Sequence, residues 1–239
     1  MKEVSILLPS LRPEYANASI NNFKLTNDDV DYELIVVSPK DNFQVEGHKT
    51  KWVDEGLQPT GSVSATIRAY EKAESDYVMY FSDDVVPTEG CLRKMLDFLK
   101  LKSYPCIGAF KMQTIFGKEI GPFGAYNKLY ACYGCLNRRT IKSIGGFFNP
   151  SYMYSWVDID MSLRCWNSTG RVEICQEASV IPMQIEDEIY KTHRSQYWSH
   201  DVENFLELWH PILGNGYERL EGSVNRRLNV NRPSNTDTQ

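Results

Sequence analysis

The chain has 239 residues, 42% of them hydrophobic, and a formal net charge of −5 at pH 7. Its length allows one large core, and its acidic balance argues against a nucleic-acid partner, because phosphate binding requires a basic face. No apolar run approaches about twenty residues, and the N-terminus lacks the apolar stretch of a signal peptide, so we expect a cytoplasmic protein without a transmembrane segment.

The six cysteines are too few for a disulfide framework in a chain of this length. Several lie in apolar runs, so we expect reduced thiols that fill the core. Cys132 and Cys135 form a C-x-x-C pair, a spacing found in zinc and redox sites. No second Cys or His pair completes a zinc site, and the sequence therefore favours core thiols over zinc.

Residues 1–104 alternate between apolar runs of strand length and segments with the helical period. The run Tyr77–Phe81 is apolar or aromatic throughout, which is typical of a central strand buried on both faces. The order of these segments predicts right-handed βαβ crossovers on a parallel sheet. The expected strands are Val4–Leu8, Glu33–Val37, Lys51–Val53 and Tyr77–Phe81, and the expected helices are Ala16–Phe23 and two that begin near Ser62 and Thr88.

Residues 105–221 differ in character, with a glycine-rich loop between their first two expected strands. No repeat or linker separates them from the first half, so we expect one domain over residues 1–221 and a polar, mobile tail over residues 222–239. The expected strands are Cys106–Met112, Leu129–Leu136, Val172–Cys175 and Ser179–Met183, and the expected helices are Thr140–Ile144, Met161–Asn167 and Asp201–Trp209.

Ser82, Asp83 and Asp84 follow directly after the strand Tyr77–Phe81. In open α/β sheets ligands bind beyond the carboxyl ends of the strands, so these acids would face a ligand. Two adjacent carboxylates repel each other unless a cation is near, and a divalent metal carrying a diphosphate would supply that charge. Taken alone, however, the motif is more simply a pair of acids in a solvated turn, or Asp83 as a helix cap.

Several motifs follow one another in an order and spacing that are specific only when taken together. They are the strand that ends at Pro9 with Arg12-Pro13-Glu14 after it, the helix start Gly61–Ala65, Ser82–Asp84, Ile144–Phe147 and Trp156–Arg164. In this the chain resembles glycosyltransferase family 2, the inverting enzymes of the GT-A fold, over roughly residues 3–210. The resemblance implies a single-domain α/β fold with a Rossmann-like, mixed but mostly parallel central sheet flanked by helices. It places a nucleotide-sugar half at about residues 1–104 and an acceptor half at residues 105–221.

The resemblance implies that a nucleotide-diphosphate sugar binds over the first half, with a UDP-sugar favoured. Asp84 would be the ligand of Mn²⁺ or Mg²⁺, and Ser82 and Asp83 would lie beside the ribose or the sugar. The base and the diphosphate would lie against the loops and helices that follow the first strands. The remaining donor-binding candidates are Pro9, Ser10, Arg12, Glu14, Ser38, Gly61 and Arg68, of which Arg68 is equally well explained as a surface arginine.

Trp156, Val157 and Asp158 match the Glu-Asp motif of the family, whose aspartate is the general base. The resemblance implies a single displacement in which Asp158 takes the proton from a hydroxyl of a glycan or related acceptor. Asp160 is more simply the N-cap of the helix Met161–Asn167.

Three aromatic side chains and one histidine are further candidates in the acceptor half. Trp156 and Tyr154, with Tyr126, are candidate platforms for an acceptor sugar, although core packing explains any one of them as well. His193 lies where some relatives have a further metal ligand, and a structural role is about equally plausible.

The sequence departs from the family at three positions that usually carry acids: Ser38, Ser82 and Val157. The substitutions at Ser82 and Val157 keep open a second hypothesis, a module that binds a nucleotide sugar or glycan without turnover. The retention of Asp84 and Asp158 argues for the enzyme. A sugar-phosphate nucleotidyltransferase is a weaker alternative, because the loop Leu8–Arg12 lacks the glycines of its phosphate-binding loop.

Overall fold

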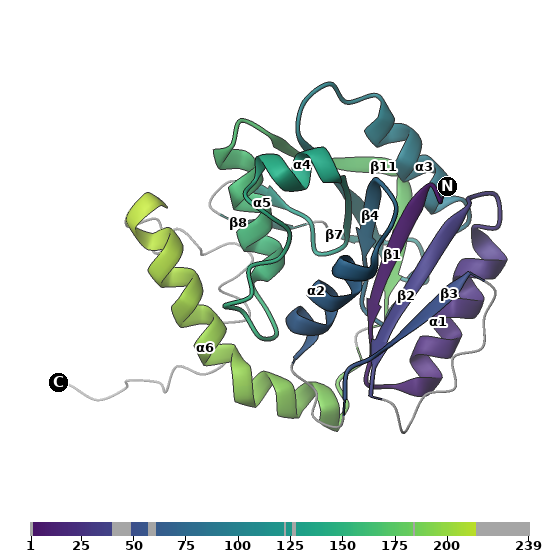
Figure 1. Ribbon diagram of the computed structural model, residues 1–239, viewed down its shortest axis with the longest axis horizontal. Helices are drawn as coiled ribbons and strands as arrows, with labels where there is room; N and C mark the ends of the chain where they lie inside the picture. The colour runs from purple at the N-terminus through teal and green to yellow at the C-terminus, as the bar shows by residue number, and fades with distance from the viewer. Residues whose placement is uncertain are drawn as a thin grey trace.

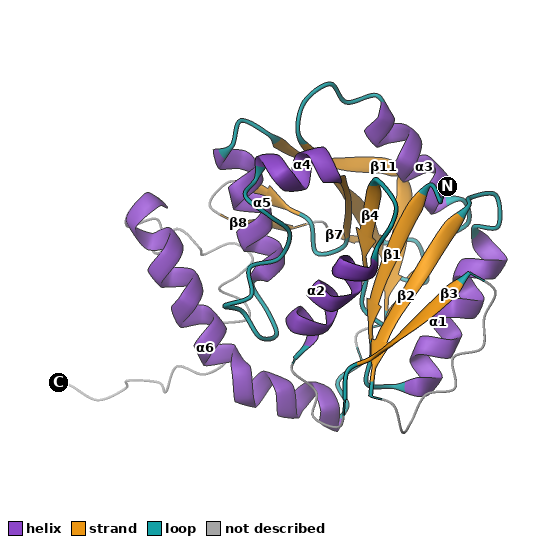
Figure 2. Ribbon diagram, viewed as in Figure 1, coloured by secondary structure: helices purple, strands orange, loops and turns teal. Residues whose placement is uncertain are grey.

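The computed structural model describes residues 2–39, 49–56, 61–121, 123–125, 128–183 and 185–213. Within these residues, one nine-stranded sheet runs through the molecule with helices on both faces (Figures 1 and 2). The strands of this sheet are β1 Val4–Pro9, β2 Tyr32–Ser38, β3 Thr50–Asp54, β4 Tyr77–Tyr80, β5 Val85–Pro87, β6 Cys106–Gln113, β7 Glu119–Gly121, β10 Gly134–Asn137 and β11 Arg171–Pro182, while β8 Phe123–Ala125 and β9 Lys128–Tyr130 form a separate pair. The helices are α1 Pro13–Thr26, α2 Ser62–Lys72, α3 Cys91–Lys100, α4 Arg138–Ser143, α5 Val157–Asn167 and α6 Glu188–Leu213.

The sheet has the strand order β3-β2-β1-β4-β10-β6-β11-β5, with β7 paired to β6. Strands β1 to β4 are parallel, as expected, and β11 is parallel to β6. Strand β10 is antiparallel to both of its neighbours, β4 and β6, and β5 is antiparallel to β11. The longer ladders are parallel, so the prediction of a mixed, mostly parallel sheet in one α/β domain is confirmed.

Burial explains why the central strands form where they do. Nearly every residue of β1 and β2 is buried, because helices cover both faces of a parallel sheet. On one face α1 and α3 pack against alternate residues of β1 and β4, with Phe23 fully buried. Truncation of such a phenylalanine to alanine typically costs about 3–5 kcal/mol. On the other face lie α2, α4 and α5.

A third apolar cluster joins α6 to α5 and to the start of α2. It contains Trp156, Phe205 and Trp209. Helix α6 therefore runs along the side of the molecule, beside α5 (Figure 1). In the part of the chain that the structure describes, no helix combines the length and the apolar character needed to cross a membrane.

Some expected boundaries are wrong. The expected strand Leu129–Leu136 is divided into β9 and β10, because the backbone of Ala131 bonds the side chains of Ser162 and Tyr80 instead of a neighbouring strand. The two strands expected after α5 are one, β11, with a shift of register against β6 between Cys175 and Ser179. The expected tail, residues 222–239, and Tyr126 lie outside the described residues.

Helices α5 and α6 begin well before their expected starts. Helix α5 starts at Val157 rather than Met161, with Trp156 in the left-handed region (φ 66°) as its N-cap residue. Helix α6 starts at Glu188 rather than Asp201, and Pro211 lies inside its last turn. The prediction that Asp160 is an N-cap is therefore wrong, since Asp160 lies within α5.

Candidate active site

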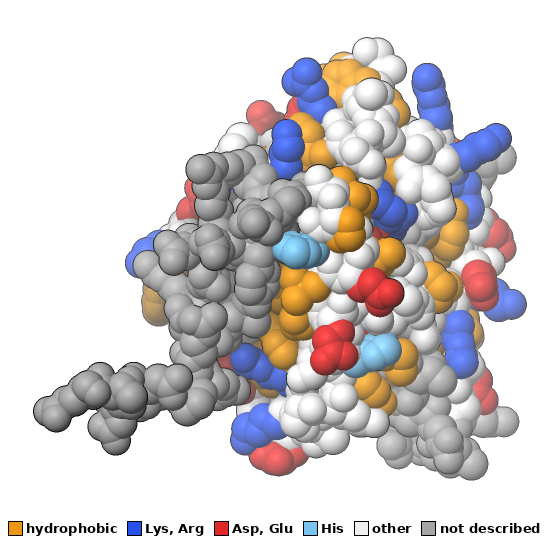
Figure 3. Space-filling view, turned by 90° about the vertical axis from the view of Figure 1, so that its left-hand side faces the viewer, with side chains coloured by type: hydrophobic (Ala, Val, Ile, Leu, Met, Phe, Trp, Pro, Cys, Tyr) orange, Lys and Arg blue, Asp and Glu red, His pale blue; other side chains and the backbone are white. Residues whose placement is uncertain are grey.

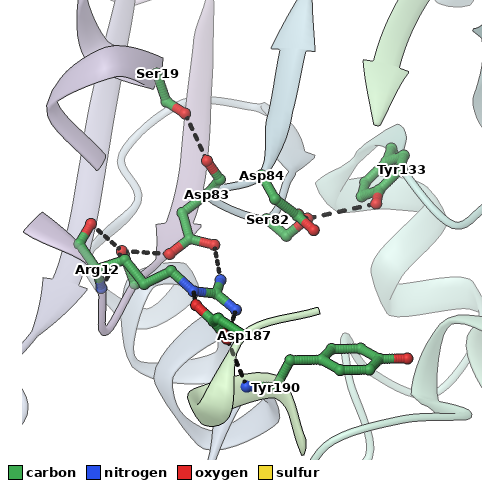
Figure 4. A network of polar contacts seen from close by, with 9 residues as sticks. Arg12, Ser19, Ser82, Asp83, Asp84, Tyr133, Asp187 and Tyr190 are labelled. Atoms are coloured by element: carbon green, nitrogen blue, oxygen red, sulfur yellow. Dashed lines mark hydrogen bonds and ion pairs between the residues drawn. The ribbon is translucent and has the colours of Figure 1, made fainter. Parts of the chain in front are cut away.

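Asp83 lies at the carboxyl ends of β1 and β4, which are parallel neighbours. Its side chain is buried, with 6% exposed, and accepts hydrogen bonds from Ser10 Oγ at 2.6 Å and Arg12 Nη1 at 2.7 Å (Figure 4). Burial raises the pKa of Asp83, and these two partners oppose that shift. The structure thus brings together Ser10, Arg12 and Asp83, which sequence analysis placed in one donor site.

Arg12 also binds a second carboxylate, that of Asp187, which comes just before α6. Its Nε and Nη2 atoms donate to the two carboxylate oxygens of Asp187 at 2.6 and 3.1 Å. Asp187 in turn accepts from the backbone N–H of Tyr190 at 2.8 Å, the bond of an N-cap residue. Sequence analysis missed Asp187. An aspartate three residues before Tyr190 is a helix-start signal that could have identified it.

Asp84 points away from this pair, toward Ser82 and Tyr133 (Figure 4). Ser82 Oγ donates to a carboxylate oxygen of Asp84 and lies 3.4 Å from the hydroxyl of Tyr133. Burial raises the pKa of Tyr133, and the negative charges of Asp84 and Asp158 raise it further, so the phenol is neutral at pH 7. The expected metal ligand and the expected base therefore both act on one tyrosine, which sequence analysis did not single out.

Asp158 lies in the first turn of α5, where the helix dipole favours a negative charge. It is half-buried, and its charge also raises the pKa of Tyr80, after the larger effect of burial. The hydroxyl of Tyr80 donates to the backbone carbonyl of Ala131 at 2.6 Å. Asp158 thus raises the pKa of a tyrosine in β4 as well as that of Tyr133.

Asp160 is a buried acid whose hydrogen bonds join two helices. It is 2% exposed, and its two oxygens accept from Arg164 Nε and Trp209 Nε1, each at 2.9 Å. The Arg164 guanidinium also donates to the backbone carbonyls of Ile144, Gly146 and Phe147. One network therefore joins α5, α6 and the Ile144–Phe147 motif.

The two candidate acceptor residues lie in different surroundings. Trp156 is 6% exposed and packs between the rings of Trp198 and Phe205, so it offers little surface to a sugar. Tyr154 is half-buried, and its ring lies edge-on to Tyr190 and His193, with centroids 6.3 and 6.0 Å away. Their roles as acceptor platforms stay predictions.

His193 is half-buried on α6, between the rings of Tyr154 and Tyr197. Burial lowers its pKa, and the charge of Arg12 lowers it further, so the imidazole is neutral at pH 7 and able to coordinate a metal. Figure 3 shows the α6 side of the molecule, where histidine and acidic side chains lie among apolar ones.

The remaining donor candidates are less closely connected to this centre. Arg68 donates to the backbone carbonyl of Glu55 at 3.0 Å, and Ser38 is buried with its hydroxyl accepting from Trp52 Nε1 at 2.8 Å. Glu14 is exposed in the first turn of α1, and Pro9 ends β1 beside Val37.

Gly61 precedes α2 with φ 95°, close to the loop before α5. A Cβ atom at this position would lie 2.4 Å from the carbonyl oxygen of Met153. A glycine is therefore required for this close approach of the two halves.

The described ranges contain few side chains that could ligate a metal ion together. No group of three His, Cys, Asp or Glu side chains there could hold a metal ion. Mg²⁺ is often held by one or two carboxylates together with substrate phosphates, so Asp84 alone is compatible with a metal that arrives with the donor. Cys132 and Cys135 form no disulfide bond; Cys135 is buried, as expected for a core thiol, whereas Cys132 is half-buried.

No protein-family model and no curated protein matches the sequence. Solved structures do share its fold. The mannosyltransferase PcManGT from Pyrobaculum calidifontis, in complex with GDP-Man and Mn²⁺, has a TM-score of 0.62 at 12% identity over 89% of this chain and 68% of that one. S. aureus TarS 1–349, in complex with UDP-GlcNAc, has a TM-score of 0.58 at 11% identity over 94% of this chain and 77% of that one.

A longer S. aureus TarS structure gives a TM-score of 0.58 at 13% identity. It matches 81% of this chain, which spans 38% of that protein's length. At these identities the likeness shows the fold alone. The chain therefore has the GT-A-like, Rossmann-like α/β fold that its sequence predicts.

Proposed function

We propose that the protein is an inverting, metal-dependent glycosyltransferase that moves a sugar from a nucleotide-diphosphate sugar to a hydroxyl of a glycan or related acceptor. The observation that carries the proposal is the position of two acids: Asp84, which follows β4 and accepts a hydrogen bond from Ser82, whose Oγ is 3.4 Å from the hydroxyl of Tyr133, and Asp158, in the first turn of α5. The negative charges of both acids raise the pKa of Tyr133. The reaction needs two acids with separate tasks at one place, and this pair provides them.

The reaction is a single displacement at the anomeric carbon. The acceptor oxygen forms a bond to that carbon while the bond to the diphosphate oxygen breaks, and the hydroxyl proton passes to Asp158. Attack from the side opposite the leaving group inverts the configuration.

The donor side uses the polar groups at the ends of β1 and β4. Asp84 would hold Mn²⁺ or Mg²⁺ together with the donor diphosphate, and His193 would be the second protein ligand. The metal, when bound, neutralises the charge that develops on the departing diphosphate. The ion pairs of Arg12 with Asp83 and Asp187 fix the loop after β1, against which the nucleotide lies.

The choice of donor rests on the ligands of two solved complexes and on no contact in this protein. The TarS complex contains UDP-GlcNAc and the PcManGT complex contains GDP-Man and Mn²⁺. We favour a UDP-sugar, with a GDP-sugar as the alternative.

Asp158→Asn tests the mechanism. Asparagine keeps the shape and can accept a hydrogen bond, but it cannot take a proton at neutral pH. We expect the transfer rate to fall by about a hundred- to ten-thousand-fold. Donor affinity should barely change, because the proton moves only in the transition state. Rates come from nucleoside-diphosphate release and donor affinity from calorimetric titration.

The matched control is Asp97→Asn, which changes an acid that is 60% exposed on α3 and should leave both quantities unchanged. A wild-type protein that binds donors but never releases nucleoside diphosphate would favour the non-catalytic binding module. Near wild-type turnover by the Asp158 variant would contradict the assignment of the base.

A further inference from the structure

Asp201, on α6, is a fully buried acid that the proposed mechanism does not use. Its carboxylate accepts hydrogen bonds from three consecutive backbone N–H groups of the loop before α5. These are the N–H groups of Met153 at 2.8 Å, Tyr154 at 2.8 Å and Ser155 at 2.7 Å. Backbone dipoles thus compensate the buried charge.

The same loop is bound from its other side by the start of α2. The backbone N–H of Val63 donates to the carbonyl of Met153 at 3.3 Å, and Ser62 Oγ donates to the carbonyl of Tyr154 at 3.2 Å. The N–H groups of the loop therefore point to α6 and its carbonyls to α2. Asp201 fixes one of the two sides.

The loop leads directly to Asp158. Trp156 follows it in the left-handed conformation and begins α5, and its ring packs against Phe205, one turn after Asp201 on α6. A shift of the loop would move both Tyr154 and the first turn of α5. Such a shift matters, because a misplacement of about 1 Å can cost about a hundred-fold in rate.

We propose that Asp201 is a positioning residue for the transfer reaction: it fixes the 153–155 loop and, through it, the location of Asp158. This inference rests on the proposed glycosyltransferase activity. In this proposal the buried carboxylate of Asp201 aligns the base with the acceptor and has no role in donor binding. Asparagine at this position would retain one accepting oxygen and place an NH₂ group against the remaining N–H groups, and alanine would retain none.

The test compares wild type, Asp201→Asn, Asp201→Ala and Asp158→Asn, with Glu203→Gln as the control for an exposed acid on the same helix. The donors are UDP-GlcNAc and GDP-mannose with Mn²⁺, and the acceptors are water and p-nitrophenyl glycosides. We measure kcat per folded molecule, the donor dissociation constant, and amide hydrogen exchange at residues 153–155. We expect kcat to fall about ten-fold for Asn and about a hundred-fold for Ala, with unchanged donor affinity and faster exchange in the loop.

Each outcome decides the question. Wild-type kcat in the folded Asp201 variants would overturn the positioning role and leave the proposed function intact. A loss of total activity that only follows the fraction of folded protein, with kcat per folded molecule unchanged, would also overturn it, because that is the signature of a structural role alone. A wild type that turns over neither donor would overturn both the function and the positioning role, even where loop exchange increases.

Discussion

Asp84 and Asp158 are 74 positions apart in the numbering, yet both raise the pKa of one phenol, that of Tyr133. The two adjacent acids have different partners: Asp83 accepts a hydrogen bond from Arg12, whereas Asp84 accepts one from the hydroxyl of Ser82. A carboxylate bound to a hydroxyl can exchange that partner for a cation at small cost. This difference supports the proposal that Asp84, rather than Asp83, is the acid that receives a metal.

Asp84→Asn should therefore remove the part of donor binding that depends on metal. For the wild type, a donor at a hundred-fold excess over its dissociation constant stabilises the native state by about 2.7 kcal/mol. We expect this stabilisation to require Mn²⁺ or Mg²⁺ in the wild type and to be insensitive to metal in the variant. Thermal unfolding with UDP-GlcNAc or GDP-mannose, with metal and with EDTA, measures it.

In the same assay His193→Ala should weaken the effect of the metal, and His210→Ala, which changes an exposed histidine near the end of α6, should not. Equal effects of the two histidine variants would remove His193 from the metal site. An unchanged metal effect in the Asp84 variant would refute the assignment of the motif.

At the scale of elements, the joint between α2 and the 153–155 loop depends on a glycine. Gly61→Ala would lower the free energy of unfolding in two ways. A positive φ costs about 1–2 kcal/mol for a residue with a side chain. The added Cβ would also overpack the carbonyl of Met153, at about 1–3 kcal/mol more. Gly56→Ala is the matched control, because Gly56 has φ 84° and nothing within 4 Å of its added Cβ. Urea unfolding should show the larger loss for Gly61, and equal losses would show that the close contact contributes nothing.

Elements whose cause is local were predictable. Strands β1, β2 and β4 are continuous apolar runs, and the apolar stripe of α3 has the helical period. The start of α5 was not predictable, because it follows Trp156, whose left-handed conformation is uncommon for a residue with a side chain, and a loop that is hydrogen-bonded to Asp201 and to α2. Tertiary contacts also set the start of α6, since its cap, Asp187, is joined to Arg12.

At the scale of the whole molecule, the contact between Arg12 and Asp187 joins residues 175 positions apart, and no local pattern predicts such a pair. The candidate site was accordingly predictable only for residues that directly follow a predicted strand. Ser10, Asp83 and Asp84 follow strands and were found, whereas Tyr133, Asp187 and Asp201 acquire their positions only from the assembled fold.

The same contact predicts a dependence of stability on pH. The hydrogen bond from Arg12 lowers the pKa of Asp187 below its ordinary 3.8, so the folded state favours the ionised carboxyl. The contribution to stability is present above pH 3.8 and is lost as the pH falls through the lowered pKa. Asp187→Asn should therefore be less stable than wild type at pH 6, with a difference that shrinks toward pH 3 in urea unfolding.

Glu188→Gln, which changes a neighbouring acid that is 86% exposed, is the control and should show no such trend. A difference between wild type and Asp187→Asn that stays constant from pH 6 to pH 3 would contradict the ion pair as its source.

The order of strands in the sheet has a consequence for how the chain is made. Strand β10 lies between β4 and β6, and β5 pairs only with β11 within the described sheet. During synthesis the first half therefore leaves the ribosome with the edge of β4 uncovered until residues 134–137 have followed it. An uncovered edge is a template for pairing with other chains. The nascent protein is thus most exposed to misassembly while residues 105–137 are still being translated. A fragment that ends near residue 104 would have this exposed edge permanently.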